Sequence, residues 1–306
     1  MAELAVPLPI RTSLTLTHVL LALVVMVVWG TNFVVIRVGL LHLPPLLFAA
    51  MRFTLVAIPA VFFLKRPAVP WRLLMGYGVL IGAGQFGLLY IAMKSSITPG
   101  LASIVVQSQA FFTIGLAMAI DRERVRMFQV AALVLAFVGI GVILAHAGAN
   151  AASPLGLVLT LGSGLGWAGG NMMSKAAGKV NMLAFVVWSA LFAAPPLFLF
   201  SLLFDGWPAI VQGVTHAPPG AWAAVVWQSV GNSMFGYGIW GWLLARYPAA
   251  TVAPMSLLVP IFGMAASAWL LAEPLPSWKI AAAALIMAGL VVNLLWPRLT
   301  ALRSIA

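Results

Sequence analysis

Residues 28–37 read Val-Trp-Gly-Thr-Asn-Phe-Val-Val-Ile-Arg and place polar groups inside a long apolar run. Residues 167–175 repeat the arrangement 138 positions later as Trp-Ala-Gly-Gly-Asn-Met-Met-Ser-Lys, with the Trp eight residues before the first cation in both copies. Polar groups inside hydrocarbon are unfavourable, because they need internal partners where water is absent. Finding them twice at matched positions predicts one site built from two halves of a duplicated protein.

The composition indicates an integral membrane protein. Of the 306 residues, 63% are hydrophobic and only 7% are charged, whereas about a quarter are charged in a soluble domain. Apolar runs long enough to cross a bilayer as helix recur along the chain, and a membrane barrel would instead alternate polar and apolar residues in short segments. We therefore predict an all-α integral membrane protein with ten transmembrane helices at 16–36, 43–64, 72–93, 97–120, 127–146, 154–174, 182–204, 221–244, 249–271 and 277–296.

The cations predict how the chain is oriented. The formal charge of +11 does not indicate nucleic-acid binding, because the cations lie mostly in short loops between apolar runs, as topology signals do. With the N-terminus inside, Arg37, Lys94 and Lys279 fall on the outer side, Arg52 falls within the second span, and the other Lys and Arg residues fall on the inner side. Both termini are predicted to be cytoplasmic.

The chain also aligns with itself. A shift of 150 places Gly139 on Gly289 and Tyr90 on Trp240, and the first spans of the two halves align at a shift of 138. We divide the chain into a first five-helix repeat at 1–148 and a second at 149–306. Because each repeat has an odd number of spans, the second must run inverted in the membrane. Inverted repeats suit alternating access, with the binding site near the midplane.

The chemistry of catalytic membrane sites is missing from the spans. The five acids, Glu3, Asp121, Glu123, Asp205 and Glu273, all fall near span ends or in loops, and the chain has no Cys. Carboxylate relays and acid-ligated metal sites need buried acids, and the four His residues form no metal-binding spacing. We therefore expect no catalytic residue, no metal and no cofactor, which disfavours an enzyme acting on lipid.

The polar residues within the predicted spans are mostly amides, and several aromatic residues lie at similar depth. Amides donate to a carboxylate and accept from an ammonium without being charged themselves, which suits a zwitterion, and aromatic walls can hold an ammonium over a ring face. The alternatives are helix–helix contacts for the amides and an interfacial belt for the Trp side chains. The candidate substrate-binding residues are Trp29, Asn32, Gln85, Tyr90, Gln109, Trp167, Asn171, Trp188, Asn232 and Trp240.

Two further features bear on the spans. Prolines predict bends at Pro59, at Pro195-Pro196, and at Pro254 and Pro260, because each removes a backbone donor. The first half has Gln109-Ala110 where the second has Val259-Pro260, so we expect the two halves to bend differently. Arg52 lies well inside the second span and needs a partner that the sequence does not identify.

The ten-span repeat, a Trp in the first span of each half, and an acid after the fourth and ninth spans together resemble the drug/metabolite transporter (EamA) superfamily. The acid motifs read Ala119-Ile120-Asp121-Arg122-Glu123 and Leu271-Ala272-Glu273-Pro274-Leu275. The resemblance covers nearly the whole chain, which looks most similar to the YddG-type exporters of aromatic and other amino acids. It implies a multi-pass carrier of the bacterial inner membrane that moves amino acids outward.

The leading hypothesis is an exporter of neutral, aromatic and other apolar amino acids that works by alternating access. Without an acid at mid-depth, we expect facilitated uniport rather than ion exchange. We expect the protein to act as a monomer, with a small-molecule substrate and the lipid bilayer as its partners and no nucleic acid. The alternatives are export of drugs or other small metabolites and, from another class, a membrane-embedded lipid-modifying enzyme.

Overall fold

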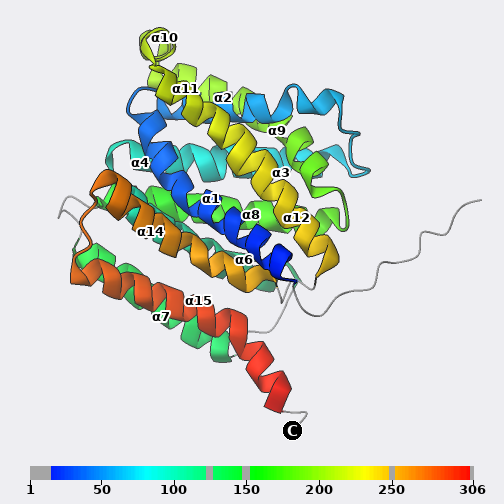
Figure 1. Cartoon of the computed structure of the whole chain (residues 1–306), viewed down its shortest axis with the longest axis vertical. Helices are drawn as coiled ribbons and strands as arrows, with labels where there is room; N and C mark the ends of the chain where they lie inside the picture. Colours follow the sequence, from blue (N-terminus) through cyan, green and yellow to red (C-terminus); the bar gives the residue numbers. More distant parts are fainter. Residues whose placement is uncertain (1–14, 122–126, 147–151, 248–251, 304–306) are drawn as a thin grey trace, which may run out of the picture.

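The computed structural model describes residues 15–121, 127–146, 152–247 and 252–303 and is built from helices (Figure 1). Arg122 and Glu123 of the first acid motif lie outside the described residues. The first half contains α1 (Leu16–Leu40), α2 (Pro45–Ala57), η1 (Ala60–Phe62), α3 (Trp71–Val79), η2 (Leu80–Gly87), α4 (Leu88–Ser95), α5 (Pro99–Val105), η3 (Val106–Ser108), α6 (Gln109–Asp121) and α7 (Met127–Ala145). The second contains α8 (Pro154–Ala177), α9 (Met182–Phe200), η4 (Ser201–Asp205), α10 (Trp207–His216), α11 (Pro219–Val226), η5 (Trp227–Phe235), α12 (Gly236–Arg246), η6 (Ala253–Leu257), α14 (Leu258–Leu271) and α15 (Ser277–Arg303).

Several described helices are long and apolar enough to cross a membrane. Six meet that requirement within the described ranges, at Leu16–Leu40, Pro45–Phe62, Trp71–Ser95, Pro99–Ile120, Met127–Ala145 and Met182–Asp205. Two shorter apolar helices follow at Met255–Leu271 and Ser277–Asn293. The fold is therefore that of a multi-pass membrane protein.

Local sequence explains where many helices begin. Proline occupies a first-turn position in α2, α5, α8 and α11, where its missing N–H leaves no bond unmade. Ser153 and Asn181 cap α8 and α9, because their side-chain oxygens accept from the backbone N–H groups of Gly156 and Ala184. The segment between α9 and α11, which lies outside the ten predicted spans, contains the helix α10.

Glycine allows the helices to pack closely. A Cβ atom on Gly166 of α8 would lie 2.7 Å from the backbone nitrogen of Gln85 in η2. A Cβ on Gly289 of α15 would lie 2.6 Å from the carbonyl oxygen of Ala132 in α7, and Gly139 packs on α15 in the same way. Small residues at such contacts let membrane helices approach, and α7 and α15 lie side by side at one end of the molecule (Figure 1).

The backbone departs from the α-helix at matched places in the two halves. The π-helical segments η2 and η5 interrupt the third and eighth predicted spans, and the 3-10 segments η3 and η6 interrupt the fourth and ninth. π-helical turns occur often at functional sites. The fourth and ninth spans both contain a 3-10 turn, although only η6 contains a proline, and the expectation that the two halves bend differently stays a prediction.

Proline predicts only some of the interruptions. Helix α2 ends at Ala57 shortly before Pro59, and Pro254 lies in η6. Pro195-Pro196 instead lies inside α9, which runs on to Phe200, and Pro260 lies inside α14. The helix continues through both of these places, and the predicted bends at Pro195-Pro196 and Pro260 stay predictions.

Candidate functional site

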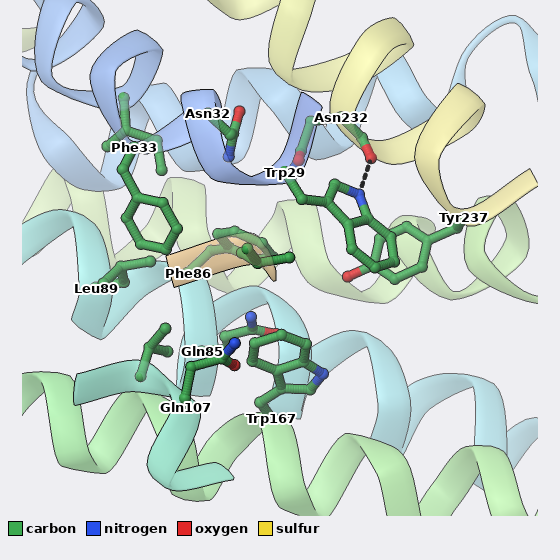
Figure 2. A pocket seen from close by; sticks show the side chains of 13 residues that line it. Trp29, Asn32, Phe33, Gln85, Phe86, Leu89, Gln107, Trp167, Asn232 and Tyr237 are labelled. Carbon is green, nitrogen blue, oxygen red and sulfur yellow. Dashed lines mark hydrogen bonds between the residues drawn. The ribbon is translucent and has the colours of Figure 1, made fainter. Parts of the chain in front are cut away.

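A cavity of about 50 Å³ lies among helices from both halves of the chain. Its walls come from α1, η2, α4 and η3 of the first half and from α8, η5, α12 and α14 of the second half (Figure 2). The lining residues are Trp29, Asn32, Phe33, Ile36, Gln85, Phe86, Leu89, Val106, Gln107, Trp167, Asn232, Tyr237 and Val259. A volume of this size holds a few water molecules, so a larger ligand requires side chains to move.

The polar groups of the cavity are neutral amides and aromatic donors. Figure 2 shows Trp29, Asn232 and Tyr237 on one side of the cavity and Gln85, Gln107 and Trp167 on the other. The indole Nε1 of Trp29 donates to the backbone oxygen of Asn232 at 3.1 Å. The side-chain oxygen Oε1 of Gln85 is buried and has no hydrogen-bond partner among the described residues. That atom is available to accept from a ligand.

A chain of buried hydrogen bonds runs away from the cavity. Asn32 Oδ1 accepts from Gln228 Nε2 at 2.6 Å, and Gln228 Oε1 accepts from the hydroxyl of Tyr90 at 3.1 Å. The Tyr90 oxygen in turn accepts from Arg52 Nη1 at 3.2 Å. All four side chains are buried. The network therefore connects a residue of the cavity wall to a cation in the interior.

Arg52 lies in a neutral environment. Its Nε and Nη2 atoms donate to Ser233 Oγ at 3.2 and 2.9 Å, and its guanidinium lies 3.6 Å from the centre of the Phe86 ring. A second cavity of about 10 Å³ adjoins Arg52, and Phe86 and Tyr237 line both cavities. These contacts answer the question that the sequence left open, because the described partners of Arg52 are hydroxyl groups and aromatic rings.

Comparison with known proteins identifies the family. The model of the EamA-like transporter family matches residues 16–145 and 154–295. The chain belongs to this family. The resemblance to the drug/metabolite transporter superfamily is thereby confirmed, and the family name indicates a transporter rather than an enzyme.

The relatives of this EamA-like chain include named efflux proteins. A probable amino-acid metabolite efflux pump of Salmonella typhimurium is 45% identical over 89% of this chain and 93% of its own length. Its counterpart in Escherichia coli is 42% identical with the same coverage. An uncharacterized inner membrane transporter, YedA of Escherichia coli, is 29% identical over 52% of this chain and 56% of its own. The protein is thus a multi-pass transporter of the inner membrane with a small-molecule substrate.

Solved structures support the fold of this family member. One crystal structure superposes with a TM-score of 0.61 at 20% sequence identity and covers 92% of this chain and 98% of that chain. At this identity the likeness concerns the fold alone.

The structure brings half of the predicted site residues to the cavity. Trp29, Asn32, Gln85, Trp167 and Asn232 line it. Trp240 does not line it, and its ring centre lies 5.5 Å from that of Trp29. The residues Trp29 and Trp167, expected to occupy equivalent places in the repeat, both contact the same cavity.

Four of the other predicted residues are engaged elsewhere. Asn171 Nδ2 donates to Gln109 Oε1 at 2.9 Å, so these two amides join α8 to α6. Trp188 donates from its indole to the backbone oxygen of Leu64 at 2.9 Å. Tyr90 is fully buried, with its hydroxyl held by Arg52 and Gln228. Tyr90, Gln109, Asn171, Trp188 and Trp240 therefore do not line this cavity, and the alternative of helix–helix contact describes the pair Gln109–Asn171.

Sequence reasoning missed Phe86 and Tyr237, which lie between the two cavities. An apolar ring in an apolar span carries no signal of its own. Phe86 directly follows Gln85, and a candidate polar residue in a span rich in glycine was the available hint. Phe86 lies in the π-helical segment η2, which no recognisable sequence pattern predicts, and Tyr237 lies in α12 just after η5.

A separate polar cluster lies near the predicted outer ends of the spans. Glu273 Oε1 forms an ion pair with Lys279 at 2.8 Å and accepts from Thr98 Oγ1 at 2.5 Å. Glu273 Oε2 accepts from the backbone nitrogen of Gly100 in the first turn of α5 at 2.9 Å. Both charged side chains are buried. The cluster joins the beginning of α5 to α15, and it explains the acid of the second motif as a structural group.

Proposed function

We propose that this protein exports neutral amino acids, aromatic and other apolar ones included, through the cavity between its two halves. The single observation that carries the proposal is a cavity lined by amides and aromatic rings from both halves. The names of the Salmonella typhimurium and Escherichia coli relatives support an amino-acid metabolite as the substrate class. The protein itself performs transport and no catalysis.

The wall chemistry suits a zwitterion with an apolar side chain. The unpartnered Oε1 of Gln85 accepts from an ammonium group, and the rings of Trp29 and Trp167 offer apolar contact and a π face for the same cation. The lining contains no carboxylate, imidazole or ammonium group among the described residues. A ligand with balanced charges is therefore favoured over one with a large net charge.

The transport machine is two inverted repeats of five helices, residues 1–148 and 149–306, which rock about the cavity. Helix contacts support this division. The repeat relates α1 to α8, α2 to α9 and α6 to α14, and the contacts follow this relation: α1 packs on α14, α8 packs on α6, and α2 packs on α9. The matched π-helical and 3-10 segments of the two halves support it as well. Both termini face the cytoplasm, and one chain suffices for transport.

Flux into proteoliposomes that contain only the purified protein tests the proposal. Vesicles loaded with unlabelled L-phenylalanine, L-leucine or L-serine are expected to take up the labelled amino acid by exchange, and protein-free vesicles are not. A substrate spectrum limited to drugs or other metabolites would contradict the amino-acid assignment. Turnover of lipid without solute flux would instead support the enzyme that the sequence disfavours.

A further inference from the structure

Arg52 has hydrogen-bonding capacity that the described protein does not use. A guanidinium carries five N–H donors, and the three hydrogen bonds of Arg52 go to Ser233 and Tyr90. Two donors thus have no acceptor among the described residues. The side chain is fully buried, so water does not freely supply the missing acceptors.

The charge of Arg52 is also uncompensated within the described part of the chain. Its contacts there are hydroxyl groups and the rings of Phe53 and Phe86. A buried cation is strongly unfavourable unless it is paired. An ionisable residue inside a membrane protein is expected to serve a substrate or ion pathway. Arg52 therefore has the properties of a group that binds an anion.

The Phe86 ring lies between Arg52 and the central cavity. Phe86 lines the central cavity and also lines the small cavity beside Arg52, where its ring covers the guanidinium at 3.6 Å. Tyr237 lines both cavities as well. Rotation of the Phe86 ring away from Arg52 would join the two spaces.

The size of the central cavity makes such a movement necessary. About 50 Å³ holds a few water molecules and no whole amino acid. The small cavity lies beside Arg52, and the joined space would expose the unused N–H donors of its guanidinium. Planar guanidinium groups bind carboxylates through paired hydrogen bonds.

We propose that Arg52 binds the carboxylate of the transported amino acid, and that the Phe86 ring must swing aside for the contact to form. Gln85 then receives the ammonium group across the cavity. This inference rests on the proposed function and deepens it, because it assigns the carboxylate to a subsite outside the present cavity wall. Tyr90 and Ser233 are positioning residues that hold the guanidinium in place.

Binding to the protein in lipid nanodiscs tests the proposal with L-phenylalanine, L-leucine and L-serine, each compared with its methyl ester. The ester keeps the ammonium and the side chain but lacks the carboxylate. The unmodified protein is expected to bind the best of the three acids at least about tenfold more tightly than its ester. Arg52→Gln is expected to abolish this preference while the Kd of the ester stays unchanged. Arg66→Gln, the same change at an exposed arginine, is expected to behave as the unmodified protein.

A second variant covers the case in which Arg52→Gln does not fold. Phe86→Leu keeps Arg52 and removes the ring that covers it, so the preference for acid over ester is expected to rise severalfold. Equal binding of acid and ester by the unmodified protein, or an unchanged acid-to-ester ratio in the variants, would overturn the role of Arg52 and leave the proposed function standing. Failure to bind any acid or any ester would instead count against the proposed function.

Discussion

Gln85 carries a buried acceptor that folding leaves unused. An unpaired polar atom in the interior is unfavourable, by about 1–3 kcal/mol in mutational data. No donor among the described residues forms a hydrogen bond to Gln85 Oε1. Two amides in the interior thus differ in kind: the Gln109 side chain is bonded to Asn171, and the Gln85 oxygen has no described partner.

Gln85→Leu is expected to separate stability from transport. Removing the unpaired oxygen should leave the thermal unfolding temperature unchanged or higher, because no described hydrogen bond to that atom is lost. Amino-acid flux should fall about tenfold or more, since a hydrogen bond to a charged group contributes about 1.5–3 kcal/mol. The matched control is Gln109→Leu, which breaks the bond to Asn171 and is expected to lower the unfolding temperature. A Gln85→Leu protein that is less stable yet transports normally would contradict the assignment.

At the scale of single residues, the sequence indicated which polar side chains lie at membrane depth better than it indicated which of them face the cavity. Asn32 and Gln85 were identifiable because amides at membrane depth are rare and unfavourable. Tyr90 was not distinguishable from them, since its role depends on Arg52, which lies on another helix and is 38 positions away along the chain. The role of Phe86 could not be predicted from the sequence, because it depends on the position of the ring between two cavities.

At the scale of helices, the close contact between η2 and α8 positions the cavity wall. Gly166→Ala would place a methyl group 2.7 Å from the backbone nitrogen of Gln85, where backbone rather than a flexible side chain must move. We expect destabilisation of about 1–3 kcal/mol, as found for overpacked interiors, together with reduced flux. Gly141→Ala in α7 is the control, because its new methyl group meets nothing within 4 Å. Thermal unfolding in detergent measures both, and equal stability of the two variants would contradict the packing argument.

The polar cluster around the ion pair Glu273–Lys279 joins the beginning of α5 to α15 and gives a second test at this scale. Glu273→Gln leaves the Lys279 ammonium buried without its carboxylate, and breaking a buried pair in this way costs about 3–5 kcal/mol. Removing both charges with Glu273→Gln and Lys279→Met is expected to recover part of that loss. Unfolding temperatures of the two single variants and the double variant measure the coupling. Strictly additive effects would show that the pair makes no joint contribution.

The apolar runs and their short loops predicted the helical fold, because hydrophobic length is decisive in a membrane. The matched breaks at η2 and η5 were not predicted: these segments contain no proline. A π-helical turn arises when packing favours an extra residue in a turn, which local sequence does not specify. Helix α10 was not among the predicted spans, and its Pro208 lies in the first turn, where proline is compatible with a helix.

At the scale of the whole molecule, the titratable groups near the cavity bear on whether transport is coupled to protons. Ion-coupled carriers usually contain a titratable carboxylate or His where substrate binding and protonation compete. Among the described residues, the cavity between the two halves contains neither, and the buried Glu273 is already paired with Lys279. A carrier that alternates its access around such a cavity would equilibrate the substrate alone.

We therefore expect facilitated uniport, in which efflux follows the substrate's own gradient. In proteoliposomes with equal labelled amino acid on both sides, an imposed pH gradient of about two units should produce no net accumulation, because no group of the described cavity binds a proton with the substrate. The control is a tenfold gradient of the amino acid itself, which should drive net flux at the same rate with or without a protonophore. Accumulation that requires the pH gradient and collapses with the protonophore would contradict uniport and place the proton-binding group outside the described cavity wall.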